Sequence, residues 1–192
     1  MPTAKKRTKT VTMMNGVPVD RLEETIEAVS ADPELGKSEF RARNRWIKGG
    51  HNRSTITDFY CAGEERVHEK PFELDNGEHE VLLGNDDGPN PVEQVLHGLA
   101  GCVTTTFVYY AAAQGIEIDE VESELTGHLD LQGMLGTAPV KPGYTDVQIK
   151  LRVKSDAPVA KLQELATLAQ NRSPVLSTVS SPVDLDVELE RM

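Results

Sequence analysis

Residues 90–115 read NPVEQVLHGLAGCVTTTFVYYAAAQG, and this stretch decides the fold. It begins with Asn90, a capping residue, followed by a proline at the first helical position, and it ends at Gly115, which can close a helix in the left-handed conformation. About 24 residues at 1.5 Å each make a helix roughly 36 Å long. No Asp, Glu, Lys or Arg occurs from Val95 to Ala113. An almost wholly apolar circumference predicts a helix that is buried on all sides.

The segments on both sides of this helix predict strands and shorter helices, so the fold class is α+β. The period-two stretches predict strands over residues 39–46, 121–131, 147–153 and 183–189. β-Branched and aromatic residues predict a strand over residues 54–60, and a further strand is expected over residues 80–83. The 3.6-residue pattern predicts helices over residues 20–30, with Asp20 as the candidate cap, and 158–170, with a further short helix opening at Ser173. Gly49-Gly50 joins the first two strands as a hairpin, and residues 133–143 form a loop.

These elements predict one folded domain behind a short tail. Residues 1–16 are expected to be a disordered basic tail, because Lys5, Lys6, Arg7 and Lys9 have no apolar run behind them. Residues 17–192 then form a single domain. Its parts are an N-terminal helix (17–36), a β-hairpin region (37–84), the central helix (90–115) and a C-terminal αβ part (118–192).

Charge and cysteine content exclude several classes of function. Asp and Glu number 31 against 20 Lys and Arg, a net charge of −11, and such a surface repels nucleic acid and anionic membranes. No stretch approaches the roughly 20 apolar residues of a membrane span. The cysteines, Cys61 and Cys102, are far apart and lack metal-ligand spacing, so neither a metal nor another cofactor is expected. A soluble protein of a reducing compartment, the cytoplasm, fits these features best.

The apolar helix also predicts the oligomeric state. So few strands of one chain cannot cover it on all sides, and a second subunit would bury the remainder. We therefore expect an obligate homodimer.

The segment from Gly88 to Cys102, with Pro91-Val92-Glu93 followed by small and Leu residues, resembles the OsmC/Ohr superfamily. RNRW at 43–46, GHLDLQGMLG at 127–136, the PGY at 142–144 and SPV at 173–175 extend the resemblance, which runs from about Gly16 to the end. It implies an interwoven homodimer in which a long buried central helix of each chain is sandwiched by antiparallel sheets from both chains. Residues at the subunit interface would then form the sites.

The resemblance also implies a chemistry. Members of this superfamily reduce organic hydroperoxides with two cysteines and serve the oxidative stress response, with a peroxiredoxin-like activity. Cys102 matches the first cysteine, whereas Ser173 stands where the second is expected, so an intramolecular disulfide cycle cannot operate. The family places an Arg and a Glu beside the thiol. Glu93 matches the Glu position, and Arg53 is the nearest match to the Arg, with Arg45 as the rival.

The residues themselves test this assignment. A thiol is ionised near neutral pH only beside a positive charge, a hydrogen-bond donor or a helix N-terminus, and Cys102 lies about three turns into its helix, where the dipole has faded. Glu93 precedes Cys102 by nine residues, roughly half a turn out of phase and about 13 Å away, so it would have to come from the partner chain. There it could orient Arg53, which would pair with the thiolate.

Other interpretations of the same residues remain open. Cys102 can be a small core residue, since free cysteine is often buried. Glu93 can be a first-turn carboxylate that the helix dipole favours. Ser173 is most simply a helix cap, and His97 a core or interface residue. Tyr109 shares the face of Cys102 and could line a pocket.

The sequence thus supports two functions of different class. The first is a thiol-dependent hydroperoxide reductase in which Cys102 attacks the peroxide and an external thiol reduces the resulting sulfenic acid. The second is a non-catalytic dimeric module that binds a small apolar molecule at the subunit interface.

Overall fold

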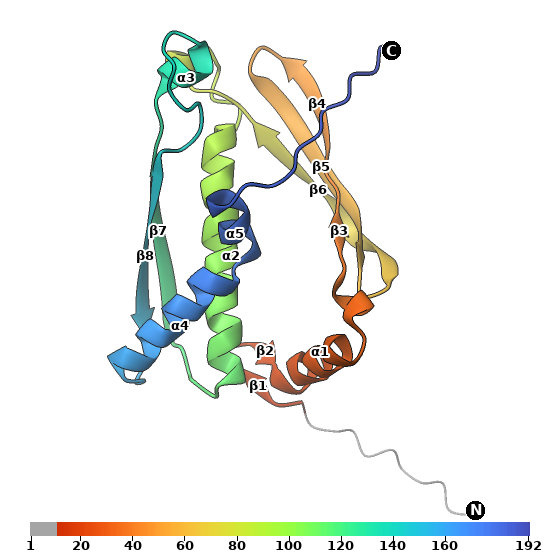
Figure 1. Ribbon diagram of the computed structural model, residues 1–192, viewed down its shortest axis with the longest axis vertical. Helices are drawn as coiled ribbons and strands as arrows, with labels where there is room; N and C mark the ends of the chain where they lie inside the picture. Colours follow the sequence, from red (N-terminus) through yellow and green to blue (C-terminus); the bar gives the residue numbers. More distant parts are fainter. Residues whose placement is uncertain (1–10) are drawn as a thin grey trace, which may run out of the picture. The chain divides into compact units, whose positions relative to one another are not determined.

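The computed structural model describes residues 11–192, so the predicted basic cluster from Lys5 to Lys9 lies outside the described residues. The chain forms two compact units, one ending at Val95 and the other running from Leu96 to Met192. Each unit is described in turn (Figure 1).

The first unit opens with a small hairpin. The sequence predicts disorder up to Gly16, whereas strand β1 (Met13–Met14) pairs with β2 (Val17–Pro18) across an Asn15-Gly16 turn in which both residues have positive φ. Helix α1 (Val19–Ala31) follows as predicted, and a 3₁₀ helix, η1 (Pro33–Gly36), ends it. The expected Asp20 cap is wrong. Pro18 is the capping residue, and the Asp20 carboxylate accepts a hydrogen bond from the Thr12 N–H instead.

A four-stranded antiparallel sheet makes up most of the first unit. The predicted hairpin is confirmed, with β4 (Arg43–Lys48) pairing with β5 (His51–Cys61) across Gly49-Gly50. Strand β3 (Glu39–Phe40) pairs further along the same side of β5. On the other side lies β6 (Glu64–Asn76), which the sequence analysis does not identify. Its pattern is interrupted at residues 68–71, where the register shifts and Pro71 sits, and such interruptions suit an edge strand.

The segment between β6 and the central helix folds back on itself. The strand predicted over residues 80–83 is wrong, because Glu80–Leu82 is a 3₁₀ helix (η2) and Leu83 is left-handed with φ of 65°. This turn lets the Asp86 N–H reach the Glu78 carbonyl at 2.9 Å and the Gly77 N–H reach the Pro89 carbonyl at 3.1 Å. The loop thereby joins the end of β6 to the first turn of α2.

Helix α2 (Pro91–Ala113) confirms the predicted central helix, and its buried stripe forms the core of the second unit. Strands β7 (Glu120–His128) and β8 (Asp146–Lys154) form a two-stranded antiparallel sheet beside it, as predicted. The fully buried residues repeat every four positions along α2 and continue on α4: Leu99, Val103, Phe107, Ala111, Leu165 and Ala169. The apolar sides of both strands pack against this cluster.

Three helices complete the second unit. Helices α4 (Val159–Arg172) and α5 (Pro174–Ser180) confirm the predicted pair. The short helix α3 (Leu131–Leu135) is capped by the Asp130 carboxylate, and it occupies the end of the predicted first strand and the start of the predicted loop. The last predicted strand, residues 183–189, is wrong for the single chain, because residues 182–192 contain no regular element.

The apolar character of α2 exceeds what its own unit buries. Only the stripe through Leu99 and Phe107 is fully covered, while Gly101, Thr105 and Tyr109 on another side are exposed. Contrary to the expectation that no stretch approaches a membrane span, α2 is long and apolar enough for one by length and composition alone. The core helix of a soluble protein passes the same test, so this property is weak evidence for a membrane. The cover that a second subunit would give remains a prediction.

Candidate functional site

Cys102 lies in the middle of α2, on the flank of its buried stripe, and is half-buried. Its position follows from helix geometry, because the next residue, Val103, points into the core. The Cys102 carbonyl accepts a 2.8 Å hydrogen bond from the Thr106 hydroxyl, but within Leu96–Met192 no hydrogen bond or ion pair to the sulfur is found. Tyr109, two turns further on, is half-exposed on the same side. Cys102 is therefore partly exposed in the single chain, and its own unit supplies no hydrogen-bond donor to the sulfur.

Ser173 is a helix cap, as the simplest interpretation of the sequence predicts. Its hydroxyl accepts a 3.3 Å hydrogen bond from the Leu176 N–H at the start of α5, and only 1% of the residue is exposed. The structure therefore gives Ser173 a capping role.

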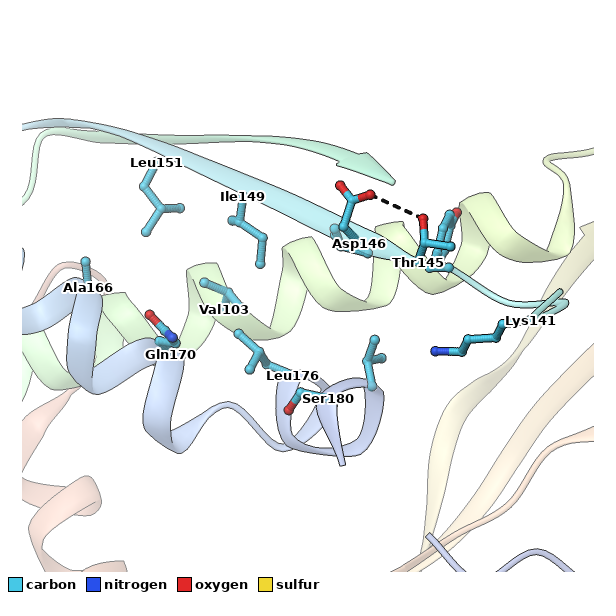
Figure 2. Close-up of a pocket in the computed structure, with 13 residues that line it drawn as sticks. Val103, Lys141, Thr145, Asp146, Ile149, Leu151, Ala166, Gln170, Leu176 and Ser180 are labelled. Atoms are coloured by element: carbon cyan, nitrogen blue, oxygen red, sulfur yellow. Dashed lines mark hydrogen bonds between the residues drawn. The ribbon is translucent and has the colours of Figure 1, made fainter. Parts of the chain in front are cut away.

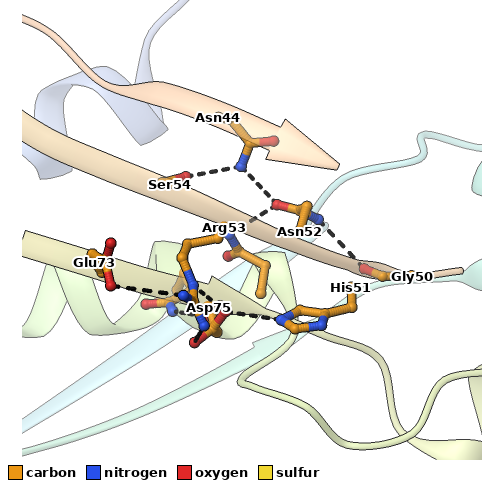
Figure 3. A network of polar contacts seen from close by, with 10 residues as sticks. Asn44, Gly50, His51, Asn52, Arg53, Ser54, Glu73 and Asp75 are labelled. Atoms are coloured by element: carbon orange, nitrogen blue, oxygen red, sulfur yellow. Dashed lines mark hydrogen bonds and ion pairs between the residues drawn. The ribbon is translucent and has the colours of Figure 1, made fainter. Parts of the chain in front are cut away.

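Arg53 lies on β5 and is held by a carboxylate of the neighbouring strand (Figure 3). The register places Asp75 of β6 directly opposite it. The Arg53 Nε and a terminal nitrogen donate to the two Asp75 oxygens at 2.8 and 3.0 Å, which is the bidentate arrangement that fixes a guanidinium best. The His51 Nε2 lies 2.8 Å from Asp75 Oδ1, and Glu73 lies 3.7 Å from Arg53.

This pairing changes the acidity of the aspartate. The hydrogen bonds from Arg53, and secondarily from His51, lower the pKa of Asp75 to about 2, because they favour the ionised carboxylate. The same hydrogen bond raises the pKa of Arg53. Asp75 therefore carries its negative charge, and Arg53 its positive charge, throughout the range in which a protein is normally assayed.

Arg45, the rival for the role of Arg53, lies directly opposite it on β4. A row of Arg45, Arg53 and Asp75 thus crosses three strands on one face of the sheet. Like charges directly opposite one another are destabilising, and Asp75 offsets this by neutralising the central arginine. Arg45 itself forms no ion pair with any residue from 11 to 192. Both arginines remain candidates, and Arg53 is the one with a fixed orientation.

The remaining arginines of this hairpin are neutralised elsewhere. Arg41 and Arg43 both donate to Asp58, at 3.0 and 2.7 Å, and the hydrogen bond from Arg43, followed by that from Arg41, lowers the pKa of Asp58 to about 2. Arg41 also donates to Glu65. Arg41 and Arg43 are therefore paired with carboxylates.

Glu93 completes a capping box at the start of α2. The Asn90 side chain accepts from the Val92 N–H at 2.9 Å, and the Glu93 carboxylate accepts from the Asn90 N–H at 2.9 Å. This reciprocal arrangement is what a first-turn carboxylate provides structurally. A single chain thus gives Glu93 a structural role, and its predicted contribution to the site around a partner's Cys102 stays a prediction.

The first turn of α2 is tied to the Arg53 network. The Gln94 side chain donates to the Asp75 carbonyl at 3.3 Å, and the Asn90 amide donates to Glu78. Gly88 packs against the same carbonyl so closely that an added Cβ would lie 2.8 Å from its oxygen, a contact that only glycine allows. Cys102 follows Gln94 by eight residues, about 12 Å further along the helix.

Sequence reasoning missed Asp75 and His51. Neither lies in a motif, and their partnership with Arg53 depends on the register of β6, which the interrupted pattern of that strand conceals. The reverse face of the sheet carries a second polar network, in which Asn52 accepts hydrogen bonds from Asn44 at 2.7 Å and Asn76 at 3.1 Å. Amide side chains thus make this face of the sheet polar, like the face that carries Arg53.

Two further residues considered in the sequence analysis are Cys61 and His97. Cys61 is a free, half-buried cysteine at the end of β5, and its sulfur accepts a 3.4 Å hydrogen bond from the Ser38 hydroxyl. His97 is exposed on α2. Among residues 11–192, no group of three or more His, Cys, Asp or Glu is placed to bind a metal ion.

Comparison with known proteins gives these features a context. The sequence model of the family described as "OsmC-like protein" matches residues 84–188, more than half of the 192-residue chain. No curated protein matches the sequence significantly.

Solved structures share the fold at low identity. An OsmC-like protein from Mycoplasma pneumoniae is 17% identical, with a TM-score of 0.56, and the match covers 74% of this chain and 87% of that one. An organic hydroperoxide resistance protein OsmC from Legionella pneumophila is 16% identical, with a TM-score of 0.52 and coverage of 73% and 89%. An OsmC-like protein of unknown function from Vibrio cholerae is 13% identical, with a TM-score of 0.54 and coverage of 76% and 96%.

Proposed function

The chain belongs to the OsmC-like protein family, and on that premise we propose that it reduces organic hydroperoxides with Cys102 as the peroxidatic thiol and an external thiol as reductant. The substrate class is supported by the relative from Legionella pneumophila, which is described as an organic hydroperoxide resistance protein. The protein would act in the cytoplasm, where thiol reductants are abundant.

One contrast carries this proposal: the cysteine of the central helix is partly exposed, whereas the position expected for a second cysteine is a buried helix cap. Cys102 is half-buried with a free thiol. Ser173 is fully buried and its hydroxyl caps α5. The chain therefore retains the attacking thiol without an internal thiol to resolve it, and the reductant has to come from outside.

The reaction has two stages, oxidation of Cys102 by the hydroperoxide and reduction of Cys102 by external thiols. The Cys102 thiolate attacks the distal oxygen of the hydroperoxide, the O–O bond breaks, and the alcohol leaves after taking up a proton. The cysteine is now a sulfenic acid, oxidised by two electrons. A small thiol condenses with it and releases water, and a second small thiol attacks the mixed disulfide. Cys102 returns as thiol, and the two reductant molecules leave as a disulfide.

Activation of the thiol requires a cation. The first turn of α2 is too far from Cys102 for the helix dipole to matter, and its own unit provides no donor to the sulfur. We assign this role to Arg53 of a second copy in a homodimer. Asp75 fixes the guanidinium of Arg53, and Glu93 contributes to the same site as the family resemblance implies.

The absence of a donor within Leu96–Met192 also favours a second candidate function. A thiol that no cation activates is an inert core or pocket residue, and the protein is then a non-catalytic dimeric module that binds a small apolar molecule at the interface.

Stoichiometric oxidation distinguishes the two functions. The fully reduced protein is mixed with excess cumene hydroperoxide, and the mass of the peptide that contains Cys102 is followed in time. A rapid gain of one oxygen, reversed by added thiol, is the expected result. No change over hours would refute the enzyme and leave the binding module.

The two cysteines provide matched control variants. Cys61→Ser should leave peroxide consumption intact, because Cys61 lies at a strand end and an external thiol serves as reductant. Cys102→Ser should abolish consumption with little change in stability, since the side-chain volume barely changes. Equal losses in both variants would contradict a peroxidatic role specific to Cys102.

A further inference from the structure

A cavity of about 720 Å³ lies within the second unit, between β8 and the helices α2, α4 and α5. Its volume is within the range of about 300–1,000 Å³ that is usual for small-molecule sites. Most of the side chains that line it are apolar, among them Val103, Ile149, Leu151, Ala166, Leu176 and Val179. Figure 2 shows Ile149 and Leu151 pointing from β8 toward the helices. Such walls suit an aliphatic group.

One end of this cavity is polar and carries a positive charge. The loop that leads into β8 forms this end and contributes Lys141, Tyr144 and Thr145 to the lining. Figure 2 shows the Lys141 side chain extending from the loop, with its amino group directed into the space beside α5. Lys141 forms no hydrogen bond or ion pair with any residue from 11 to 192. Because apolar walls strengthen the attraction between opposite charges, this amino group favours a ligand with an anionic end.

Two glycines fix the course of the loop that carries Lys141. A Cβ added to Gly127 of β7 would lie 2.5 Å from the Tyr144 ring, and one added to Gly133 of α3 would lie 2.8 Å from the Lys141 carbonyl group. Only glycine allows either approach. Residues 127–136 and 142–144, which take no part in the chemistry proposed for Cys102, therefore build the polar end of the cavity.

The carboxylate at this end is paired with other groups. Asp146 also lines the cavity, but its oxygens lie 3.0 Å from the His128 Nδ1 and accept a 3.3 Å hydrogen bond from the Thr145 hydroxyl. Figure 2 shows the carboxylate turned toward Thr145 and away from the helices. Asp146 therefore weakens the attraction for an anion without neutralising Lys141 by a direct ion pair.

The cavity is separate from the site proposed for the peroxidatic thiol. Cys102 does not line it, although the next residue, Val103, does. Successive side chains of an α-helix are about 100° apart, so the Cys102 side chain is directed to another side of α2. A ligand of this cavity is therefore not the hydroperoxide that Cys102 reduces.

We propose that this cavity binds an amphipathic carboxylate, with its aliphatic chain between β8 and the helices and its carboxylate at Lys141. The ammonium group of lysine is a compact point charge, which suits a single anionic group. The apolar walls select a saturated chain, because polar groups of a ligand would lose their hydrogen bonds to water there. This site is independent of the proposed function, because none of its residues takes part in the reduction of hydroperoxides.

Calorimetric titration of the reduced, full-length protein tests the proposal with octanoate and, as the uncharged ligand of the same chain length, octanol. Lys141→Gln should raise the Kd of octanoate about tenfold, because a hydrogen bond to a charged group is lost, and should leave the Kd of octanol nearly unchanged. The matched control is Lys150→Gln. Lys150 lies on the outward face of the same strand without an ion pair to the described residues, so its replacement should affect neither ligand.

A second variant tests the position of the chain. Ala166→Leu adds a larger side chain to the wall of the cavity and should raise the Kd of both ligands about tenfold, with circular dichroism as the check on folding. Binding that Ala166→Leu leaves unchanged in a folded protein would overturn the proposal. So would the absence of octanoate binding to the unsubstituted protein, or equal Kd values of octanoate for Lys141→Gln and Lys150→Gln. The comparison of the two lysine variants decides the question even if Ala166→Leu does not fold.

Discussion

Replacing Ser173 by alanine separates a structural from a chemical role at the position where a second cysteine is expected. The Ser173 hydroxyl accepts one hydrogen bond, from the Leu176 N–H at 3.3 Å, in a site that is 99% shielded from solvent. Alanine cannot accept it, so a buried N–H at the start of a seven-residue helix loses its partner.

The expected cost is that of a lost cap, about 1 kcal/mol in the free energy of unfolding. For a chain of this size, that corresponds to a fall in Tm of about 2–4 °C. The turnover of hydroperoxide per Cys102 should stay unchanged, because in our proposal Ser173 takes no part in either step. Thermal unfolding by circular dichroism and peroxide consumption at 25 °C measure the two effects on the same sample.

The matched control is Ser180→Ala at the other end of α5. Its hydroxyl donates to the Ser177 carbonyl at 3.4 Å on an exposed face, so the free energy of unfolding should change by less than about 0.5 kcal/mol. A loss of turnover in Ser173→Ala without a loss of stability would show that the hydroxyl serves Cys102, and it would refute a purely structural role for Ser173. An unchanged Tm would refute the capping role.

Three further expectations concern the dimer, the thiol and the pair of Asp75 with Arg53. The protein should sediment as a dimer at micromolar concentration, because α2 exposes apolar surface that a soluble monomer rarely tolerates, and a folded monomer would contradict this. Cys102 should react quickly with iodoacetamide at pH 6–7 and about tenfold more slowly in Arg53→Gln, since an adjacent cation favours the thiolate; equal rates would leave Cys102 a packing residue. Asp75 has a folded-state pKa lowered to about 2, so the stability that its pair with Arg53 contributes should be fully present above about pH 4 and lost as the pH falls toward 2, whereas Asp75→Asn should show a flatter decline in pH-dependent unfolding.

The central helix could be predicted from sequence because its signals are local. The cap at Asn90, the proline at the first helical position and the Gly115 end lie within the helix itself, and the structure places the helix at Pro91–Ala113. The same holds for Ser173, where a serine before a proline is a local pattern of a helix start. Such features need no knowledge of distant residues.

The partners of Arg53 could not be predicted in this way. Asp75 lies 22 residues further along the chain, and only the register of β5 against β6 brings the two side chains together. Many of the residues that precede Asp75 in β6 are charged, and Pro71 lies among them. Their pattern therefore does not indicate a strand. The strand predicted at residues 80–83 is wrong because a short apolar run suits a strand and a turn equally, and here a left-handed Leu83 closes a 3₁₀ helix.

The error at residues 183–189 is of a different kind. The alternation there is as regular as that of β8, and β8 was predicted correctly. Period-two alternation reports how side chains are divided between two environments, but it does not report which chain supplies the neighbouring strand. A strand signal without a strand is thus expected where the hydrogen-bonding partner belongs to another molecule.

Within one chain, Asp75 performs the task that the resemblance assigns to Glu93, which is to hold Arg53. Asp75 fixes Arg53 by two hydrogen bonds within its own chain, so the orientation of the guanidinium does not depend on a partner. Glu93 is occupied by the Asn90 N–H, and it can reach a partner's site only with its second oxygen or after leaving the capping box. An arginine oriented in advance needs no further ordering when a thiolate forms beside it. If Arg53 activates Cys102, Asp75 therefore contributes most of the energy that orients the Arg53 guanidinium. Glu93 then only adjusts the position of a guanidinium that Asp75 already holds.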